Sequence, residues 1–214
     1  MPVFSVRKAF ADDVDFLVSL FKHEHVSAIL NAPTAAMFRA SFDDPSTEIY
    51  IIEADGEPIG NFLIANQEWL FEFKVLAVST PKRGAGTFAV EWGLSHAFEG
   101  SGAHRVFCEV REDNPHMIAI LERLGFAREG TYRDGFRDAQ TGEFRDLYPY
   151  GILAADYRSD RFLQLCNRCG GGDGHGIKVL LCALRASVAQ RANWTAILVQ
   201  APQLLLLVSR LRFI

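Results

Sequence analysis

The sequence predicts an α/β fold in which a mixed central sheet is flanked by helices. Between residues 71 and 126, apolar β-branched runs alternate with amphipathic helical patterns in the order strand, helix, strand, helix. Two successive strands joined by a helix pair in parallel through a right-handed crossover. Earlier in the chain, Asp55-Gly56 separates two strand-like runs, which is a strong signal for an antiparallel hairpin. The sheet should therefore contain both kinds of strand pairing.

The first half of the chain is expected to contribute four strands and two helices. Its strand-like runs alternate apolar and polar residues or are rich in β-branched residues. The first helical pattern carries Asp12 and Asp13 in its first turn, where negative charge interacts favourably with the helix dipole. The expected strands are residues 4–7, 48–53, 58–64 and 70–78, and the expected helices are residues 11–21 and 35–42.

The second half is expected to continue with a helix over residues 85–98, a strand over 104–110 and a helix over about 116–124. Apolar residues in the first of these helices are spaced to bury one face. They are Phe88, Ala89, Trp92, Leu94 and Phe98. Gly125 stands where the second helix should end, because glycine readily adopts the left-handed conformation of a helix C-cap.

A glycine turn precedes the helix that is expected to begin at residue 85. The strand-like run stops near Pro81, passes Lys82 and Arg83, and enters Gly84-Ala85-Gly86. A helix start leaves several backbone N–H groups without partners, and with the positive end of the dipole they suit a phosphate or pyrophosphate. The alternative is that these glycines only pack the helix closely against the strand. Both interpretations remain open from this pattern alone.

Composition indicates one globular domain with an appendage. The chain has 214 residues, of which 49% are apolar. Residues 159–214 contain seven Lys or Arg and two Asp or Glu, a net charge of +5. The whole chain has a net charge of −4, so residues 1–158 have a net charge of −9. The acidic body argues against nucleic-acid binding. Acidic residues appear early and no leader pattern opens the chain, so a cytoplasmic location is expected.

The C-terminal segment, residues 159–214, has a different composition. A glycine-rich linker leads into apolar, helix-compatible stretches that are too broken for a membrane span. Cys166, Cys169 and His175 suggest a metal, but a second pair of ligands at zinc-site spacing is missing, so no metal is expected. The segment could be an extra helical pair, an element that forms a homodimer, or a stretch without selected structure.

The amino-acid sequence from Asn114 to Phe126, together with the order of the predicted strands and helices before it, resembles the acyl-CoA-binding core of the Gcn5-related N-acetyltransferase (GNAT) superfamily. Residues 129–133 and 144–148 look like closing strands of its RimJ/RimL-like branch. The resemblance covers roughly residues 3–157. It implies a GNAT-type mixed sheet of six to seven strands in a domain over residues 1–158, with residues 159–214 as an extension.

The resemblance also implies acetyl-CoA as co-substrate and acetyl transfer to a primary amine, of a protein N-terminus or a small molecule. Backbone N–H groups of the glycine turn would hold the pyrophosphate, the strand end would pair with the pantetheine, and Asn114 would contact its arm. Arg123 would reach a nucleotide phosphate. The implied cofactor-binding residues are Leu76, Ala77, Val78, Lys82, Arg83, Gly84, Ala85, Gly86, Thr87, Asn114 and Arg123.

Catalysis requires a base, because an alkylamine with a reference pKa of about 10.4 arrives protonated. Glu72, at the start of the strand that would carry the cofactor, is the first candidate, and Glu109 on the neighbouring strand is the second. Each could instead be a solvated surface carboxylate. The sequence departs from the family at Pro81, which replaces a polar residue, and at Leu121, where the family has a thiolate-protonating Tyr.

These departures leave alternatives open. One is an acyl-CoA-binding module with little or no catalysis, which turnover with a panel of amines would distinguish. Another is an interaction protein that works through its apolar C-terminal segment.

Overall fold

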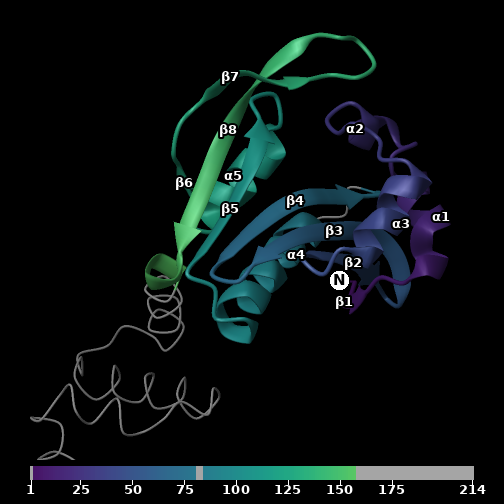
Figure 1. The fold of residues 1–214 in the computed structure, drawn as a ribbon, viewed down its shortest axis with the longest axis horizontal. Helices are drawn as coiled ribbons and strands as arrows, with labels where there is room; N and C mark the ends of the chain where they lie inside the picture. Colours follow the sequence, from purple (N-terminus) through teal and green to yellow (C-terminus); the bar gives the residue numbers. More distant parts are fainter. Residues whose placement is uncertain (1, 81–83, 158–214) are drawn as a thin grey trace, which may run out of the picture. The chain divides into compact units, whose positions relative to one another are not determined.

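The chain builds one eight-stranded mixed sheet in the order β1-β2-β3-β4-β5-β8-β6, with β7 paired to β8 (Figure 1). The computed structural model describes residues 2–80 and 84–157. Among the described strands, β4 and β5 form the only parallel pair. The strands are β1 (Phe4–Lys8), β2 (Thr47–Ala54), β3 (Glu57–Gln67), β4 (Leu70–Val78), β5 (Arg105–Arg111), β6 (Ala127–Arg128), β7 (Tyr132–Arg137) and β8 (Phe144–Leu153). The mixed sheet is confirmed, with one strand more than predicted.

Helices cover both faces of the sheet, so adjacent strand residues enter different cores. Ile52 packs into the core beneath α4 and α5, whereas Ile51 packs into the core beneath α1, α2 and α3. The helices are α1 (Val14–Leu20), α2 (Glu24–Ser27), α3 (Ala35–Asp43), α4 (Ala85–Ser95) and α5 (Pro115–Arg123). A 3₁₀ turn (Ala11–Asp13) precedes α1, and a π turn (His96–Gly100) follows α4. No helix within these described ranges combines the length and the apolar character that a membrane crossing needs.

Helix α4 buries part of the predicted face, together with Ala85, Val90 and Gly93. Gly93, with Ala89 and Leu94, lies against the sheet, and a Cβ atom on Gly93 would come within 2.6 Å of the Phe62 ring. Phe88 and Trp92 are only half buried on its flank. The prediction is confirmed for Ala89, Leu94 and Phe98, which are buried in the core. It was wrong for Phe88 and Trp92, because glycine at position 93 lets the helix approach the sheet closely along a neighbouring strip of its surface.

Turn chemistry was predicted correctly at two places. Asp55 and Gly56 have φ of 55° and 84°, as the two-residue turn of the β2–β3 hairpin requires. Gly125 has φ of 87° at the end of α5. The Cys166, Cys169 and His175 cluster and the whole C-terminal extension lie outside the described residues, as do Pro81, Lys82 and Arg83.

Candidate active site

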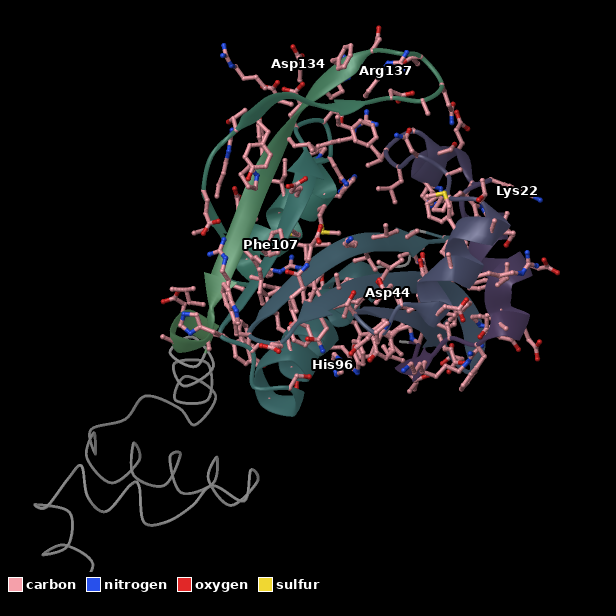
Figure 2. The ribbon with its side chains drawn as sticks, in the orientation of Figure 1. Lys22, Asp44, His96, Phe107, Asp134 and Arg137 are labelled. Carbon is pink, nitrogen blue, oxygen red and sulfur yellow. The ribbon has the colours of Figure 1, made fainter. Side chains whose placement is uncertain are left out.

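The site forms where β4 parts from β5. Their parallel ladder has three pairs and ends at Glu72 opposite Phe107, which is labelled in Figure 2. Directly afterwards β4 contains a bulge, because Ile64 of β3 lies opposite Phe73 while the adjacent Leu63 lies opposite Val75. A bulge bends its strand and increases the twist. Beyond it β4 remains paired with β3 and β5 with β8, so the two strands diverge (Figure 1).

A cavity of about 740 Å³ lies where β4 and β5 diverge. Its lining comes from both faces of the sheet. On one side lie the starts of α4 and α5, including Gly84, Thr87 and Asn114. On the other side lie the segment after α2 and the β7–β8 hairpin, represented by Ile29 and Phe136. Every described candidate residue except Arg123 lines the cavity.

The start of α4 has the geometry of an anion site. Gly84 occupies the N-cap with φ of 101°, a left-handed conformation that suits glycine, and no side chain caps the helix. Arg123 of α5 donates from Nη2 to Oγ1 of Thr87 at 2.5 Å, which brings a cation to the first turn of α4. Gly86 serves packing, because a Cβ atom there would lie 3.2 Å from Cδ1 of Ile120. Lys82 and Arg83, the two predicted cations, fall in the gap between the described ranges.

The end of β4 presents a backbone edge toward the cavity. Leu76, Ala77 and Val78 pair with β3 on one side only, since the ladder with β5 ends at Glu72. Such an edge can pair with an extended, amide-bearing chain. The carbonyl oxygen of Val78 lies 2.8 Å from Nε2 of His25, a residue of α2.

The two candidate carboxylates share one face of the sheet. Side chains alternate along β5, and Cys108 packs into the α4–α5 core, so Phe107 and Glu109 project to the opposite face. Glu72 projects to the same face as Phe107, its partner in the ladder. Oε2 of Glu72 lies 3.7 Å from Nζ of Lys74. Partial burial and the negative charge of Glu72 raise the pKa of Glu109 above its ordinary value.

Two other groups in the cavity have defined roles in the fold. Asn114 caps α5 through Oδ1, which accepts a hydrogen bond of 3.2 Å from the N–H of Met117. Burial raises the pKa of the Cys108 thiol to about 12, so it remains protonated and unreactive at neutral pH. Leu121 lines the cavity and is 1% exposed, so this position offers no proton donor.

Sequence reasoning missed three charged residues in the cavity wall, Lys74, Arg111 and Asp113, and of these Arg111 is the most buried. Arg111, at the end of β5, is 6% exposed. Its Nε and Nη2 donate to the two carboxylate oxygens of Asp113 at 2.9 and 2.7 Å, and Nη1 donates to the carbonyl of Ile29 at 3.1 Å. Asp113 is two residues away, but Ile29 is 82 residues away, so no local pattern could have shown that Arg111 is buried in this wall.

The chain was compared with family models, solved structures and curated protein sequences. The model of the Acetyltransferase (GNAT) family matches residues 14–126. The fold is similar to that of spermidine N-acetyltransferase from Vibrio cholerae in complex with CoA and spermine, with a TM-score of 0.63 at 17% identity over 72% of this chain and 98% of that chain. It is also similar to a structure described as a probable acetyltransferase, with a TM-score of 0.60 at 22% identity over 70% of this chain and 92% of that chain. No curated protein sequence matches the chain.

Proposed function

Because this chain belongs to the acetyltransferase (GNAT) family, we propose that its acceptor is a primary amine that attacks the thioester of acetyl-CoA directly. Membership makes the protein an N-acetyltransferase with acetyl-CoA as donor. The observation that carries the proposal is the cavity where β4 and β5 diverge. The uncapped start of α4, which suits an anion, lies toward one face of the sheet, and the carboxylates of Glu72 and Glu109 lie toward the other. The acceptor is the amine of a protein N-terminus or of a small molecule, as in the RimJ/RimL-like branch.

The residues of the cavity fit acetyl-CoA, which supplies an activated acetyl group. Uncapped N–H groups at the start of α4 suit a pyrophosphate, and Arg123 adds positive charge beside Thr87. The one-sided backbone edge at Leu76 to Val78 suits the amides of the pantetheine arm. We assign Lys82 and Arg83 to the same phosphate group by their place in the sequence.

We assign proton removal from the amine to the carboxylate pair. The sequence favoured Glu72, but the raised pKa of Glu109 makes it the better base, because a base is most effective when its pKa lies near the working pH. Partial burial is the main cause of this raised pKa, and the negative charge of Glu72, which lies where the strands diverge, adds to it. A backbone N–H of β4 beside the bulge would contact the thioester carbonyl as its charge develops.

The experiment that tests this function is turnover of acetyl-CoA with a panel of amines that includes linear diamines, amino sugars and amino-terminal peptides. Release of free thiol and N-acetylation of one amine class, observed by mass spectrometry, support the proposal. Leu121 favours a second candidate, an acyl-CoA-binding module without efficient catalysis, because no acid stands at that position. Binding of acetyl-CoA without acetylation of any amine would favour that candidate.

We further propose that residues 1–158 form the complete catalytic domain. Every described residue of the cavity lies at or before Leu147. Residues 159–214 would then be dispensable for catalysis.

A further inference from the structure

Lys74 is the extra residue of the bulge in β4. Phe73 and Val75, on either side of it, lie opposite adjacent residues of β3, so Lys74 has no partner in the register of these two strands. A bulge redirects the side chain that it carries. Nζ of Lys74 lies 3.7 Å from Oε2 of Glu72, so the ammonium lies on the face of the sheet to which Glu72 projects.

The amine of Lys74 belongs to the cavity and is held loosely. Lys74 lines the cavity, and no other lysine does so within residues 2–80 and 84–157. Its side chain is 44% exposed, and the distance of 3.7 Å to Glu72 is longer than a hydrogen bond. An exposed ion pair of this kind contributes little to stability, so the amine can move away from Glu72 easily.

Lys74 also stands next to the backbone edge to which we assign the pantetheine arm. That edge runs from Leu76 to Val78, and the backbone N–H assigned to the thioester carbonyl lies beside the same bulge. The four-carbon stem of lysine is flexible and ends in a primary amine. The bulge therefore carries an amine beside the place assigned to the acetyl group.

Both candidate carboxylates lie on the face of the sheet that the Lys74 ammonium occupies. Glu72 is its ion-pair partner, and Glu109 projects to the same face and lines the same cavity. An ammonium must lose a proton before its nitrogen can attack a carbonyl carbon. The raised pKa of Glu109 suits it to accept that proton.

We propose, on the premise of the proposed function, that Lys74 is an internal acetyl acceptor, which the protein acetylates in cis when no amine substrate is bound. Glu109 takes a proton from the ammonium, Nζ attacks the thioester carbonyl carbon, and the C–S bond breaks. Nζ loses a second proton as the amide forms, and the departing CoA thiolate takes up one of the two protons. Because the amide nitrogen is no longer nucleophilic, each chain accepts one acetyl group at this position.

The test incubates the full chain with acetyl-CoA and without an amine, and follows acetylation of Lys74 and Lys22 by peptide mass spectrometry. Lys22, labelled in Figure 2, is exposed and does not line the cavity, so it reports chemical acetylation without catalysis. Lys74 should react at least about 100-fold faster than Lys22, because a positioned amine has a high effective concentration. The rate constant should not depend on protein concentration, as a reaction in cis requires.

Two variants and a labelling experiment separate this reaction from simple exposure of an amine. Glu109→Gln should slow acetylation of Lys74 by about 100-fold and leave that of Lys22 unchanged. Lys22→Arg is the matched control and should leave acetylation of Lys74 at the wild-type rate. A readout without turnover uses N-hydroxysuccinimide acetate, which acetylates accessible amines. CoA at about ten times its Kd should protect Lys74 from this reagent by about tenfold and should not protect Lys22.

Equal rates at Lys74 and Lys22, or labelling of Lys74 that CoA does not reduce, overturns this inference. Acetylation of an amine substrate with Lys74 unmodified also overturns it and leaves the proposed function standing. Acetylated Lys74 with no amine substrate acetylated supports this inference and overturns transfer to a separate amine. Absence of acetyl-CoA binding in calorimetry overturns the proposed function and this inference together.

Discussion

Glu72 and Phe107 form the last pair of the parallel ladder between β4 and β5. Immediately beyond them the bulge at Lys74 directs β4 away, and the cavity opens between the two strands. The start of α4 then lies toward one face and the carboxylates toward the other. An acetyl donor held on the first face would present its reactive end to an amine on the second. Four predictions follow from this arrangement and from two polar groups elsewhere in the sheet.

Glu109→Gln should lower kcat by about 10²- to 10⁴-fold, the usual contribution of a positioned base, and leave acetyl-CoA affinity unchanged. A base accepts a proton only when ionised, so the kcat/KM of wild type should fall as the pH falls through the raised pKa of Glu109. Glu72→Gln removes one cause of that raised pKa, so the acidic limb of its pH profile should move to lower pH. Glu57→Gln, an exposed carboxylate on β3, should leave the profile in place. A profile that Glu109→Gln does not alter would rule out this base.

Gly84→Asp should abolish acetyl-CoA binding, because it places a negative charge where the pyrophosphate is expected. A Cβ atom at this position has space, with Cε2 of Phe4 at 3.7 Å, but φ of 101° strains any other residue. Gly84→Asn carries the same strain without the charge and tolerates left-handed conformations, so it is the matched control. Calorimetry should show an affinity loss of about 100-fold or more for Asp relative to Asn. Equal affinities would mean that the glycine serves only the turn.

Asn61→Leu should stabilise the fold. Asn61 is fully buried on β3 between Ile51 and Ala77, and neither Nδ2 nor Oδ1 has a hydrogen-bond partner among the described residues. Removing a buried polar group that lacks a partner should raise the free energy of unfolding by about 1 kcal/mol. Denaturant unfolding measures this change, and Asn61→Asp, which buries a carboxylate at the same place, should destabilise instead. A loss of stability in Asn61→Leu would show that the amide is satisfied, for example by a buried water.

The interaction between His96 and Glu48 should make the free energy of unfolding fall as the pH is lowered. Nε2 of His96 lies 2.7 Å from Oε2 of Glu48, which also accepts from the hydroxyl of Tyr50 at 2.7 Å. The hydrogen bond with His96 is the main cause that lowers the pKa of Glu48 to about 2. Because the folded pKa lies below the unfolded value, this stabilisation is present above about pH 4.5 and is lost as the pH falls toward 2. His96→Phe should therefore reduce the loss of stability between pH 5 and pH 3, measured by urea unfolding, and an unchanged loss would contradict the assignment.

Local patterns predicted much of the backbone and the place of the site. The bounds of β4 were predicted residue for residue, and so was the start of α4 at Ala85, because apolar runs, glycines and capping residues act over a few positions. No pattern in the sequence marks the bulge at Lys74, because the bulge depends on the register between β3 and β4. The contact of Arg111 with Ile29 could not be identified from the sequence, because 82 residues separate them and only the fold brings them together.

The most direct test of the central claim is product analysis of the full chain incubated with acetyl-CoA and a linear diamine, for wild type and Glu109→Gln. The account predicts that wild type forms the N-acetylated diamine with equimolar free CoA thiol, and that Glu109→Gln, although it binds acetyl-CoA as tightly, forms it at least about 100-fold more slowly. Acetyl-CoA binding without any acetylated amine would contradict the account and identify the protein as a CoA-binding module.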